Sequence, residues 1–503
     1  MNVVFVYPDL CPFIQDWPGA YYQGLAYLSA VLKEAGHSTS LIHVTDPSFN
    51  PDEIAETIDR RKPDLIAFSS TTNGFPTVRR LAGHFSKVFP HIPTVCGGIH
   101  STVAPEDAIA AKGIDMICVG EGEGCIVDLC EALEKGEGVD RIANLWIKKE
   151  DGIIRNSVRN LIENLDELPQ PDRELYDYPA MFVEQAGLAV FMASRGCPFS
   201  CTYCAHKGLR DSYRGKGRYV RFRSPENLIA ELRSVKQRYG FVRGIHFDDD
   251  ILFVNRAWAQ RFAELYRREI DLPFRCNIHP VLCTDEIVDL AAGCGCRELR
   301  IGLESGNEYL RNQILKRKLD RDVIVSAFSN AKSRGIRLLS FNMIGLPEET
   351  PRRILETIKL NADCDIDLAQ VSIFHPYPGT PLAEHCADKG LVSQRTVDDY
   401  YVGSILNLPD LSPRQLTMFQ LYFKDLAKLY RRLSKLPRWQ SVPLVWMIDW
   451  FLCRRIVPHV VLTARSGVHA CVGRLRQHED PNEQILAPPD SVDEQNAPVV
   501  QEA

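Results

Sequence analysis

The 503-residue sequence lacks several features that would fix its location or its partners. No uninterrupted apolar run approaches the roughly 20 residues needed to span a bilayer. The N-terminus, which begins Met-Asn-Val-Val-Phe-Val-Tyr, lacks the charged-then-apolar layout of a signal peptide. The sequence has no basic tract and its formal net charge is −6, which argues against nucleic acid as a partner. We therefore expect a cytoplasmic protein that does not bind nucleic acid.

Cysteine is plentiful, with 16 residues, but all except three are scattered along the chain. Because cytoplasmic thiols stay reduced, we interpret most of the scattered cysteines as small buried hydrophobic residues. The other three, Cys197, Cys201 and Cys204, form a C-x-x-x-C-x-x-C motif. They follow the apolar run 188–193, which is typical of a buried parallel strand. A loop at the C-terminal end of such a strand is where α/β folds carry their chemistry.

Three thiolates in one short loop fit an iron–sulfur cluster. They can bind three irons of a [4Fe–4S] cube and leave the fourth iron free for another ligand. A structural zinc site needs four ligands, usually in two separated pairs. His206 could supply a fourth ligand, so zinc remains an alternative on this segment alone, and a disulfide is a weaker one.

Residues 1 to about 135 alternate strand-like runs with helical patterns. The expected strands are 3–7, 39–44, 64–70, 94–96 and 116–119, and the expected helices are 21–35, 51–61, 77–89 and 123–133. This order predicts a flavodoxin-like (Rossmann-like) parallel sheet covered on both faces. Three strand ends carry small residues, which would let a large ligand approach the backbone, although glycine is also common in turns. These strand ends are Ser69 to Thr72, Gly97-Gly98, and Gly120 to Glu123.

The alternation resumes over residues 188–385 and predicts a partial (β/α)6 barrel of the TIM type. The expected strands are 188–193, 243–248, 274–278, 298–303, 337–344 and 369–374, and the expected helices are 225–239, 256–269, 284–292, 320–334 and 351–362. Polar or turn-forming residues collect where these strands end, on the face that carries barrel active sites. They include Asp248-Asp-Asp250, Gly302-Leu-Glu-Ser-Gly306, Asn342 to Glu349 and His375 to Pro381.

Other interpretations remain open for these strand-end residues. The three aspartates could bind Mg²⁺ or form a solvated turn. Glu304 could pair with a buried arginine, such as Arg275 or Arg300. Arg275, Asn277 and His279 could either touch a substrate inside the barrel or serve the core.

The remaining segments connect or follow the two predicted domains, 1–135 and 188–385. Segment 136–187 is expected to hold a β-hairpin, turning at Asp151-Gly152, and an ordered linker. Segment 386–476 is expected to be helical, with a helix from Ser412 to about 434 whose apolar stripe packs on the barrel. The stripe consists of Met418, Leu421, Leu426, Leu429 and Leu433.

The end of the chain adds two further expectations. Residues 442–455, with two tryptophans beside two arginines, are expected to pack or form a lid, with contact to a membrane surface as the alternative. Residues 477–503 are polar and without periodicity, which predicts disorder.

The cysteine motif, with Tyr203 before its third cysteine, resembles the signature of the radical S-adenosylmethionine (SAM) superfamily. In that family the open iron binds SAM, and an electron from the cluster cleaves SAM to a 5′-deoxyadenosyl radical. The resemblance implies that Tyr203 lies at the SAM site and that Asp249 and Asp250 hold the amino group of SAM. It further implies that Glu304 and Ser305 hold its ribose. Asn342 begins a motif similar to the one that flanks adenine.

Residues 24–37, Cys96-Gly-Gly-Ile-His100 and 119–123 resemble the cobalamin (B12)-binding domain found upstream of many radical SAM cores. The resemblance implies contacts from Ser69, Ser70, Gly97, Gly98, Gly120 and Glu121. The D-x-H-x-x-G motif of methionine synthase-like domains is absent, so no histidine from that motif would bind cobalt. Loss of the cofactor, leaving a scaffold, is the alternative. His100 is either a cobalt ligand or a loop histidine bonded to backbone.

The chain thus resembles a class B methyltransferase-like radical SAM enzyme. The resemblance implies methyl transfer from methylcobalamin to an unactivated carbon of a small molecule or lipid. It also implies an electron donor such as flavodoxin or ferredoxin. Alternatives are a cyclase or rearrangement enzyme with the same cofactors, and a non-catalytic cobalamin or cluster sensor. A tRNA methylthiotransferase is disfavoured because we find no second cysteine triad near the N-terminus and no basic C-terminal domain.

Overall fold

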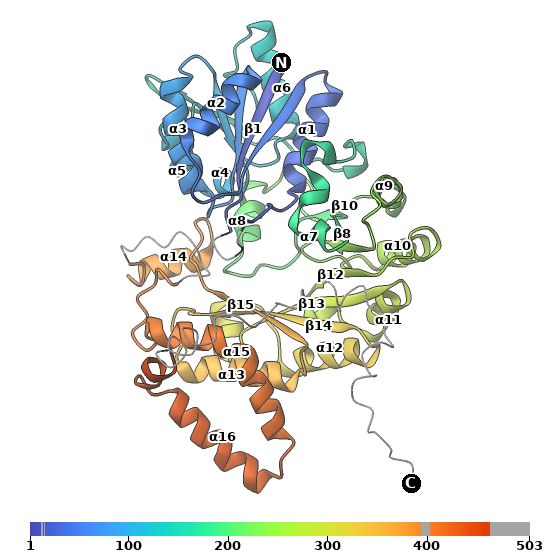
Figure 1. The fold of residues 1–503 in the computed structure, drawn as a ribbon, viewed down its shortest axis with the longest axis vertical. Helices are drawn as coiled ribbons and strands as arrows, with labels where there is room; N and C mark the ends of the chain where they lie inside the picture. The colour runs from blue at the N-terminus through green and yellow to red at the C-terminus, as the bar shows by residue number, and fades with distance from the viewer. Residues whose placement is uncertain (12–13, 15, 394–402, 463–503) are drawn as a thin grey trace.

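The computed structural model describes residues 1–11, 14, 16–393 and 403–462. Its N-terminal sheet has the strand order β2-β1-β3-β4-β5-β6-β7 (Figure 1). The first five strands are parallel, in the flavodoxin-like order predicted from the sequence. They are β1 (Asn2–Pro8), β2 (Ser38–Val44), β3 (Leu65–Ser69), β4 (Thr94–Gly97) and β5 (Met116–Cys118).

Helices cover both faces of this sheet because its strands are apolar on both sides. One apolar core lies under α1 and α6, and a second lies under α2, α3 and α5. The helices are α1 (Gln23–Glu34), α2 (Pro51–Arg61), α3 (Phe75–Val88), α4 (Ile99–Val103), α5 (Pro105–Ala110) and α6 (Glu123–Lys135). The sequence pattern did not predict the two short helices α4 and α5.

The predicted hairpin forms as β6 (Leu145–Lys149) and β7 (Gly152–Arg155). It pairs antiparallel with β5 and therefore extends the N-terminal sheet. The rest of the linker contains three single 3₁₀ turns and the short helix α7 (Phe182–Gln185). The 3₁₀ turns are η1 (Leu165–Glu167), η2 (Arg173–Leu175) and η3 (Tyr178–Ala180).

The second sheet confirms the predicted six-stranded partial barrel. All six strands are parallel, in the order β15-β14-β13-β12-β11-β8. They are β8 (Leu188–Phe191), β11 (Gly244–Phe247), β12 (Phe274–Ile278), β13 (Cys296–Glu304), β14 (Arg337–Ile344) and β15 (Leu368–Ile373). Helices alternate with the strands, as right-handed βα crossovers require. They are α9 (Pro225–Arg238), α10 (Arg256–Glu269), α11 (Asp285–Gly293), α12 (Arg321–Ser333) and α13 (Pro351–Asp363).

Smaller elements complete the barrel domain. A two-residue antiparallel pair, β9 (Ser194–Arg195) with β10 (Arg221–Phe222), and the helix α8 (Ala205–Ser212) flank the cysteine motif. The 3₁₀ turn η4 (Pro280–Leu282) and the π-helical turn η5 (Leu310–Ile314) lie in later loops. Most of the scattered cysteines are buried, as predicted.

The C-terminal region is helical, with α14 (Pro381–Asp388), α15 (Pro413–Ser434) and α16 (Arg438–Leu452). Helix α15 packs on the barrel, but the predicted stripe is partly wrong, since Leu421 and Leu429 are exposed. The buried face instead follows spacings of three and four residues. It consists of Leu416, Phe419, Phe423, Ala427 and Tyr430.

Helix α16 lies at the end of the molecule opposite the N-terminal domain (Figure 1). It therefore forms no lid over the strand ends between the two sheets. Among the described helices, none is long and apolar enough to cross a membrane. The predicted disordered segment, 477–503, lies outside the described residues.

Candidate active site between the two sheets

A cavity of about 420 Å³ lies between the two domains. On the N-terminal side, the ends of β3, β4 and β5 line it through residues such as Ser69 and Gly97. On the barrel side, the ends of β8 and β11 line it, through Met192 and Asp250 among others. Both parallel sheets thus present their C-terminal edges, where α/β folds bind ligands, to the same space.

Five of the six residues predicted to bind cobalamin line this cavity: Ser69, Gly97, Gly98, Gly120 and Glu121. Ser70 does not line it; this residue is buried, and its hydroxyl donates to the Thr71 carbonyl (2.6 Å). Gly98 has φ +94°, and a Cβ there would lie 2.6 Å from the Ser70 carbonyl oxygen. Only glycine therefore lets this turn pack closely against the neighbouring strand end.

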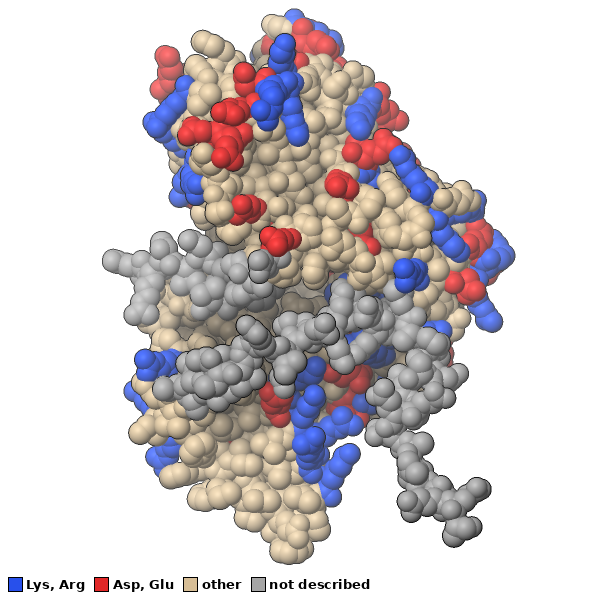
Figure 2. Space-filling view, viewed as in Figure 1, with Lys and Arg blue, Asp and Glu red and all other residues tan. Residues whose placement is uncertain are grey.

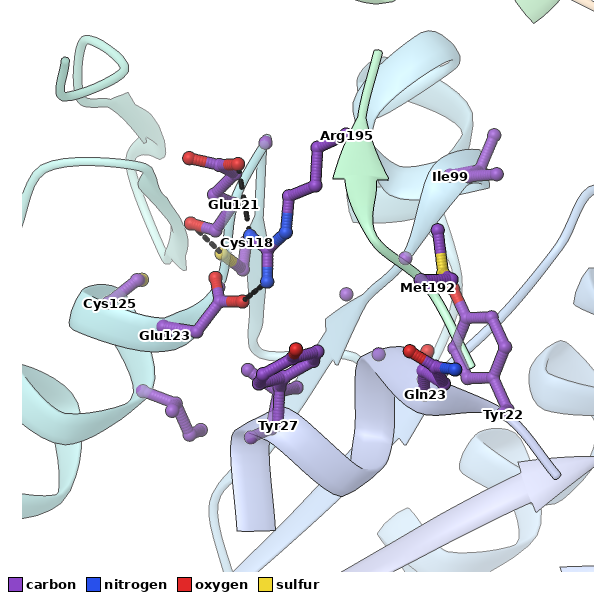
Figure 3. A pocket seen from close by; sticks show the side chains of 18 of the residues that line it. Tyr22, Gln23, Tyr27, Ile99, Cys118, Glu121, Glu123, Cys125, Met192 and Arg195 are labelled. Carbon is purple, nitrogen blue, oxygen red and sulfur yellow. Dashed lines mark hydrogen bonds and ion pairs between the residues drawn. The ribbon is translucent and has the colours of Figure 1, made fainter. Parts of the chain in front are cut away.

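The cavity extends from the strand ends toward the apolar core between α1 and α6. Its deeper wall is formed by apolar side chains, among them Phe5, Ala67, Val95, Ile126 and Leu129. Gln23, at the start of α1, also lines it (Figure 3). Gln23 is only 5% exposed, yet neither its amide oxygen nor its amide nitrogen has a hydrogen-bond partner among the described residues. Buried amides are normally paired, so Gln23 fits a ligand that supplies a polar group here.

His100 has a structural role, but it lies on α4 and its ring contacts the side chains of Thr72 and Asp107, so the predicted loop histidine bonded to backbone is wrong. Its ring stacks on Phe75, with centroids 3.9 Å apart, and its Nε2 lies 3.1 Å from Asp107. Burial lowers the pKa of His100 despite this carboxylate. His100 does not line the cavity between the sheets, although its neighbour Ile99 does.

The cysteine loop begins at the wall of the same cavity, since Ser194, Arg195 and Gly196 line it. The guanidinium of Arg210 on α8 folds back and donates to the carbonyls of Cys197 and Phe199. Burial raises the pKa of the Cys197 thiol to about 11 and that of Cys204 to about 12. Bound irons would therefore have to displace the thiol protons.

The zinc alternative fails on the geometry of His206. Its Nδ1 lies 2.7 Å from the Tyr219 hydroxyl and its Nε2 lies 2.7 Å from Asp250. Both ring nitrogens are thus engaged. Within the described residues, no three His, Cys, Asp or Glu side chains gather closely enough to hold one metal ion. With His206 engaged, the segment offers three cysteines, which is the number of thiolates that a [4Fe–4S] cluster with one open iron requires.

The two aspartates predicted to hold SAM differ in their surroundings. Asp250 lines the cavity, whereas Asp249 is fully buried. The Asp249 carboxylate accepts hydrogen bonds from the Ala193 N–H, at 3.0 Å, and from the Ser194 hydroxyl. Burial raises the pKa of Asp249 to about 7. Asp249 therefore braces the chain between β8 and the cysteine loop.

Tyr203 and Glu304 are joined through an arginine that the sequence did not indicate. Arg317 donates one N–H to the Tyr203 hydroxyl (2.9 Å) and one to Glu304 (3.0 Å). The alternative that Glu304 pairs with a buried arginine is therefore confirmed, but the partner is Arg317 and not Arg275 or Arg300. Glu304 has φ +66°, which is uncommon for a residue other than glycine. The contact ties the cysteine loop to the end of β13.

The remaining predicted SAM residues are buried. The Ser305 hydroxyl is 0% exposed and has no hydrogen-bond partner in the described part of the chain. Asn342 donates to Ser340, and its oxygen accepts from Asn361 (2.7 Å). Nearby, Glu349 accepts from two backbone N–H groups, those of Gly345 and Leu346. The strand-end motif beginning at Asn342 is therefore held by its own buried network.

Of Arg275, Asn277 and His279, which lie on β12 or just after it, the last two contact residues of the site. The Asn277 amide donates to the Asp249 carbonyl (2.8 Å). The His279 ring stacks on Phe199 of the cysteine loop, with centroids 3.7 Å apart. Arg275 is buried and donates to His246 (2.6 Å).

An ion cluster joins the two domains at the cavity wall (Figure 3). Arg195 on β9 donates to Glu121 (3.0 Å) and to Glu123 (2.5 Å). Arg221 on β10 reaches the same Glu121 carboxylate (2.9 Å). Burial alone would raise the pKa of Glu121, but the two guanidinium groups lower it below its ordinary value. We name these four residues, Glu121, Glu123, Arg195 and Arg221, the interdomain ion cluster.

Known families match both halves of the chain. The radical SAM superfamily matches residues 192–360, and the B12 binding domain matches residues 20–129. An uncharacterized methyltransferase of Pyrococcus horikoshii is 30% identical over 372 residues, which are 73% of this chain and 79% of the relative. The chain is a B12-binding radical SAM enzyme. Its cofactors are therefore SAM, a [4Fe–4S] cluster and cobalamin.

Two further similarities agree with this family. An anaerobic magnesium-protoporphyrin IX monomethyl ester cyclase of Rubrivivax gelatinosus is 25% identical over 407 residues, covering 77% of this chain and 70% of the relative. The solved structure of OxsB, a cobalamin-dependent SAM radical enzyme with aqua-cobalamin and SAM bound, superposes with a TM-score of 0.68. That likeness covers 96% of this chain and 83% of OxsB at 16% identity, so it shows the shared fold.

Proposed function

We propose that this B12-binding radical SAM enzyme transfers a methyl group to an unactivated carbon of a small-molecule or lipid substrate. The observation that carries the proposal is the shared cavity, because the strand ends of both domains and the start of the cysteine loop line it. A substrate there would meet both cofactor sites without leaving the protein. The similarity to a protein described as a methyltransferase supports the same reaction.

When bound, the cofactors supply a carbon-centred radical from SAM and a methyl group from cobalamin. The protein's part is to bind, orient and shield. Arg210 donates to the carbonyls of Cys197 and Phe199 and so holds the first part of the cysteine loop in place. The interdomain ion cluster holds the two cofactor domains at a fixed separation, and the largely apolar wall excludes water from a reactive radical.

We assign the cofactor contacts within the predicted segments 1–135 and 188–385. Cys197, Cys201 and Cys204 bind the cluster. Asp250, at the cavity, binds the SAM amino group, and the group comprising Tyr203, Glu304, Ser305 and Asn342 shapes the rest of the SAM site. The cobalamin contacts come from Ser69, Gly97, Gly98, Gly120 and Glu121. Ser70 supports these strand ends from the buried side, and Asp249 supports the cysteine loop in the same way.

The test uses anaerobically reconstituted protein with SAM labelled in its methyl group. Methyl transfer predicts 5′-deoxyadenosine together with a labelled product. Deoxyadenosine with an unlabelled, rearranged product would contradict methyl transfer and favour the second candidate, a cyclase. That candidate is supported by the similarity to the Rubrivivax gelatinosus cyclase. Absence of deoxyadenosine would contradict both.

The partners follow from the chemistry. The cluster needs a low-potential electron donor, and we propose flavodoxin or ferredoxin in the cytoplasm. The substrate is a small molecule or lipid whose reacting carbon enters the cavity. We also propose that residues 442–455 contact a membrane surface, and this proposal is independent of the proposed reaction.

A further inference from the structure

The outer face of α16 exposes large apolar side chains to solvent. Trp439 is 76% exposed, Trp446 66% and Trp450 49%. These are three of the six tryptophans in the chain. Val442, Met447, Phe451, Ile456 and Val460 are also exposed. Monomeric soluble proteins rarely leave so much contiguous apolar surface uncovered without a use for it.

This exposure is not the result of a loosely attached helix. The opposite face of α16 packs against α13 and α15 through Leu444, Val445, Ile448 and Leu452. Asp449 lies on the packed side, where it pairs with Lys359 and accepts a hydrogen bond from the Tyr430 hydroxyl (2.6 Å). The helix is thus held in one orientation, with its tryptophans directed away from the protein.

The residues around this face carry positive charge. The segment from the end of α15 to just after α16 contains six cations, of which Arg431 pairs with Asp365 on the barrel: Arg431, Arg432, Lys435, Arg438, Arg454 and Arg455. Its one acidic residue is Asp449, which is engaged on the packed side. Arg454 lies over the Trp450 ring, 4.0 Å from its centroid. The tip formed by α16 appears as an almost uncharged surface in Figure 2.

We propose that α16 docks the enzyme on an anionic lipid bilayer, with the helix lying in the plane of the interface. Tryptophan rings have an apolar body and a polar N–H, which suits the headgroup region, and the cations suit anionic headgroups. The 15-residue helix is about 22 Å long, shorter than the roughly 30 Å hydrocarbon core, so it lies on the bilayer. A second copy on this face would bring two basic rims together, which like-charge repulsion opposes.

The docking does not depend on the proposed reaction, so the two can be tested separately. Full-length holoprotein is mixed with vesicles of phosphatidylcholine alone or with about a third phosphatidylglycerol, and bound protein is separated by flotation. We expect binding to the anionic vesicles that weakens as salt is raised. Brominated lipids should quench tryptophan fluorescence, because half of the tryptophans would enter the interface.

Two sets of variants and one control sharpen the test. Trp446→Glu with Trp450→Glu should abolish flotation and quenching. Lys435→Gln with Arg438→Gln should weaken binding by about fivefold for each cation removed. Val88→Glu replaces an exposed apolar residue on α3, at the other end of the molecule, and should bind like the unaltered protein.

The outcomes separate lipid from other occupants. Circular dichroism and iron content check that each variant is folded. No binding to either vesicle, or equal and salt-independent binding to both, would overturn the proposal. So would a dimer in sedimentation velocity that Trp446→Glu dissociates while flotation is unchanged.

Discussion

The interdomain ion cluster allows a direct test of how the two cofactor domains are held together. Glu121 bridges Arg195 and Arg221, and its side chain is only 14% exposed. Glu121→Gln removes its negative charge and leaves a surplus positive charge at the cavity wall, since Arg195 keeps Glu123 but Arg221 loses its carboxylate partner in the cluster. Breaking a buried pair by removing one partner costs about 3–5 kcal/mol. We expect that loss mainly at the contact between the two domains.

We expect Glu121→Gln to cleave SAM at the cluster as before but to convert less of that cleavage into product. Glu121→Gln should keep its iron content and still form 5′-deoxyadenosine. The amount of product formed per deoxyadenosine should fall, because the substrate radical and the cobalamin edge are no longer held in register. Both species are measured in one assay by mass spectrometry.

A matched control is available in the same domain. Glu106 pairs with Arg155, but the Glu106 side chain is 63% exposed, and such surface pairs contribute about 0–1 kcal/mol. Glu106→Gln should therefore leave both measurements unchanged. If Glu121→Gln and Glu106→Gln have the same thermal stability and the same product ratio, the ion cluster does not hold the domains and the reasoning is refuted.

Three further predictions concern the cofactor sites and the buried acid. Cys201→Ala should abolish cluster absorbance and SAM cleavage, whereas Cys453→Ala should change neither; an active Cys201 variant would contradict the cluster assignment. Gly98→Ala should lower cobalamin content after reconstitution, because its Cβ would lie 2.6 Å from a backbone oxygen, and unchanged content would contradict this. Burial raises the pKa of Glu349 from 4.5 to about 8, so the protonated acid is favoured in the folded state. The free energy of unfolding should therefore fall as pH rises from 4.5 to 8, by a few kcal/mol at about 1.4 kcal/mol per pKa unit. In Glu349→Gln this fall in the free energy of unfolding between pH 4.5 and 8 should disappear. Denaturant unfolding at several pH values, without SAM, measures the free energy for both proteins.

The sequence predicted the regular elements well because each depends on local periodicity. Strands β12 and β14 and helices α2 and α10 begin and end at the predicted residues. The pairing of the β6–β7 hairpin with β5 was missed because no local pattern states which edge a hairpin joins. The outward face of α15 was misjudged because two apolar spacings compete along the same helix.

Site residues could be predicted where they are close together in the sequence and were missed where only the fold brings them together. The cysteine motif is contiguous, so its chemistry could be inferred directly. Glu121 was predicted as a cobalamin contact, but its partners Arg195 and Arg221 lie 74 and 100 residues away, and only the fold brings them together. Gln23 was missed, although an amide inside the apolar pattern of α1 was a usable signal. Arg317 was missed because it lies 13 residues beyond Glu304, past η5, and no local pattern pairs it with Glu304 or Tyr203.

The contact between Gly120 and Tyr213 has a consequence for how the enzyme matures. A Cβ at Gly120 would lie 2.0 Å from the Tyr213 hydroxyl, and that hydroxyl accepts from the Glu121 N–H. Tyr213 follows α8, the helix that leaves the cysteine loop. One short stretch of chain therefore carries the cysteines to which we assign the cluster and also contacts the strand end to which we assign cobalamin. We expect binding of either cofactor to order this shared contact, so iron insertion and vitamin uptake should favour each other.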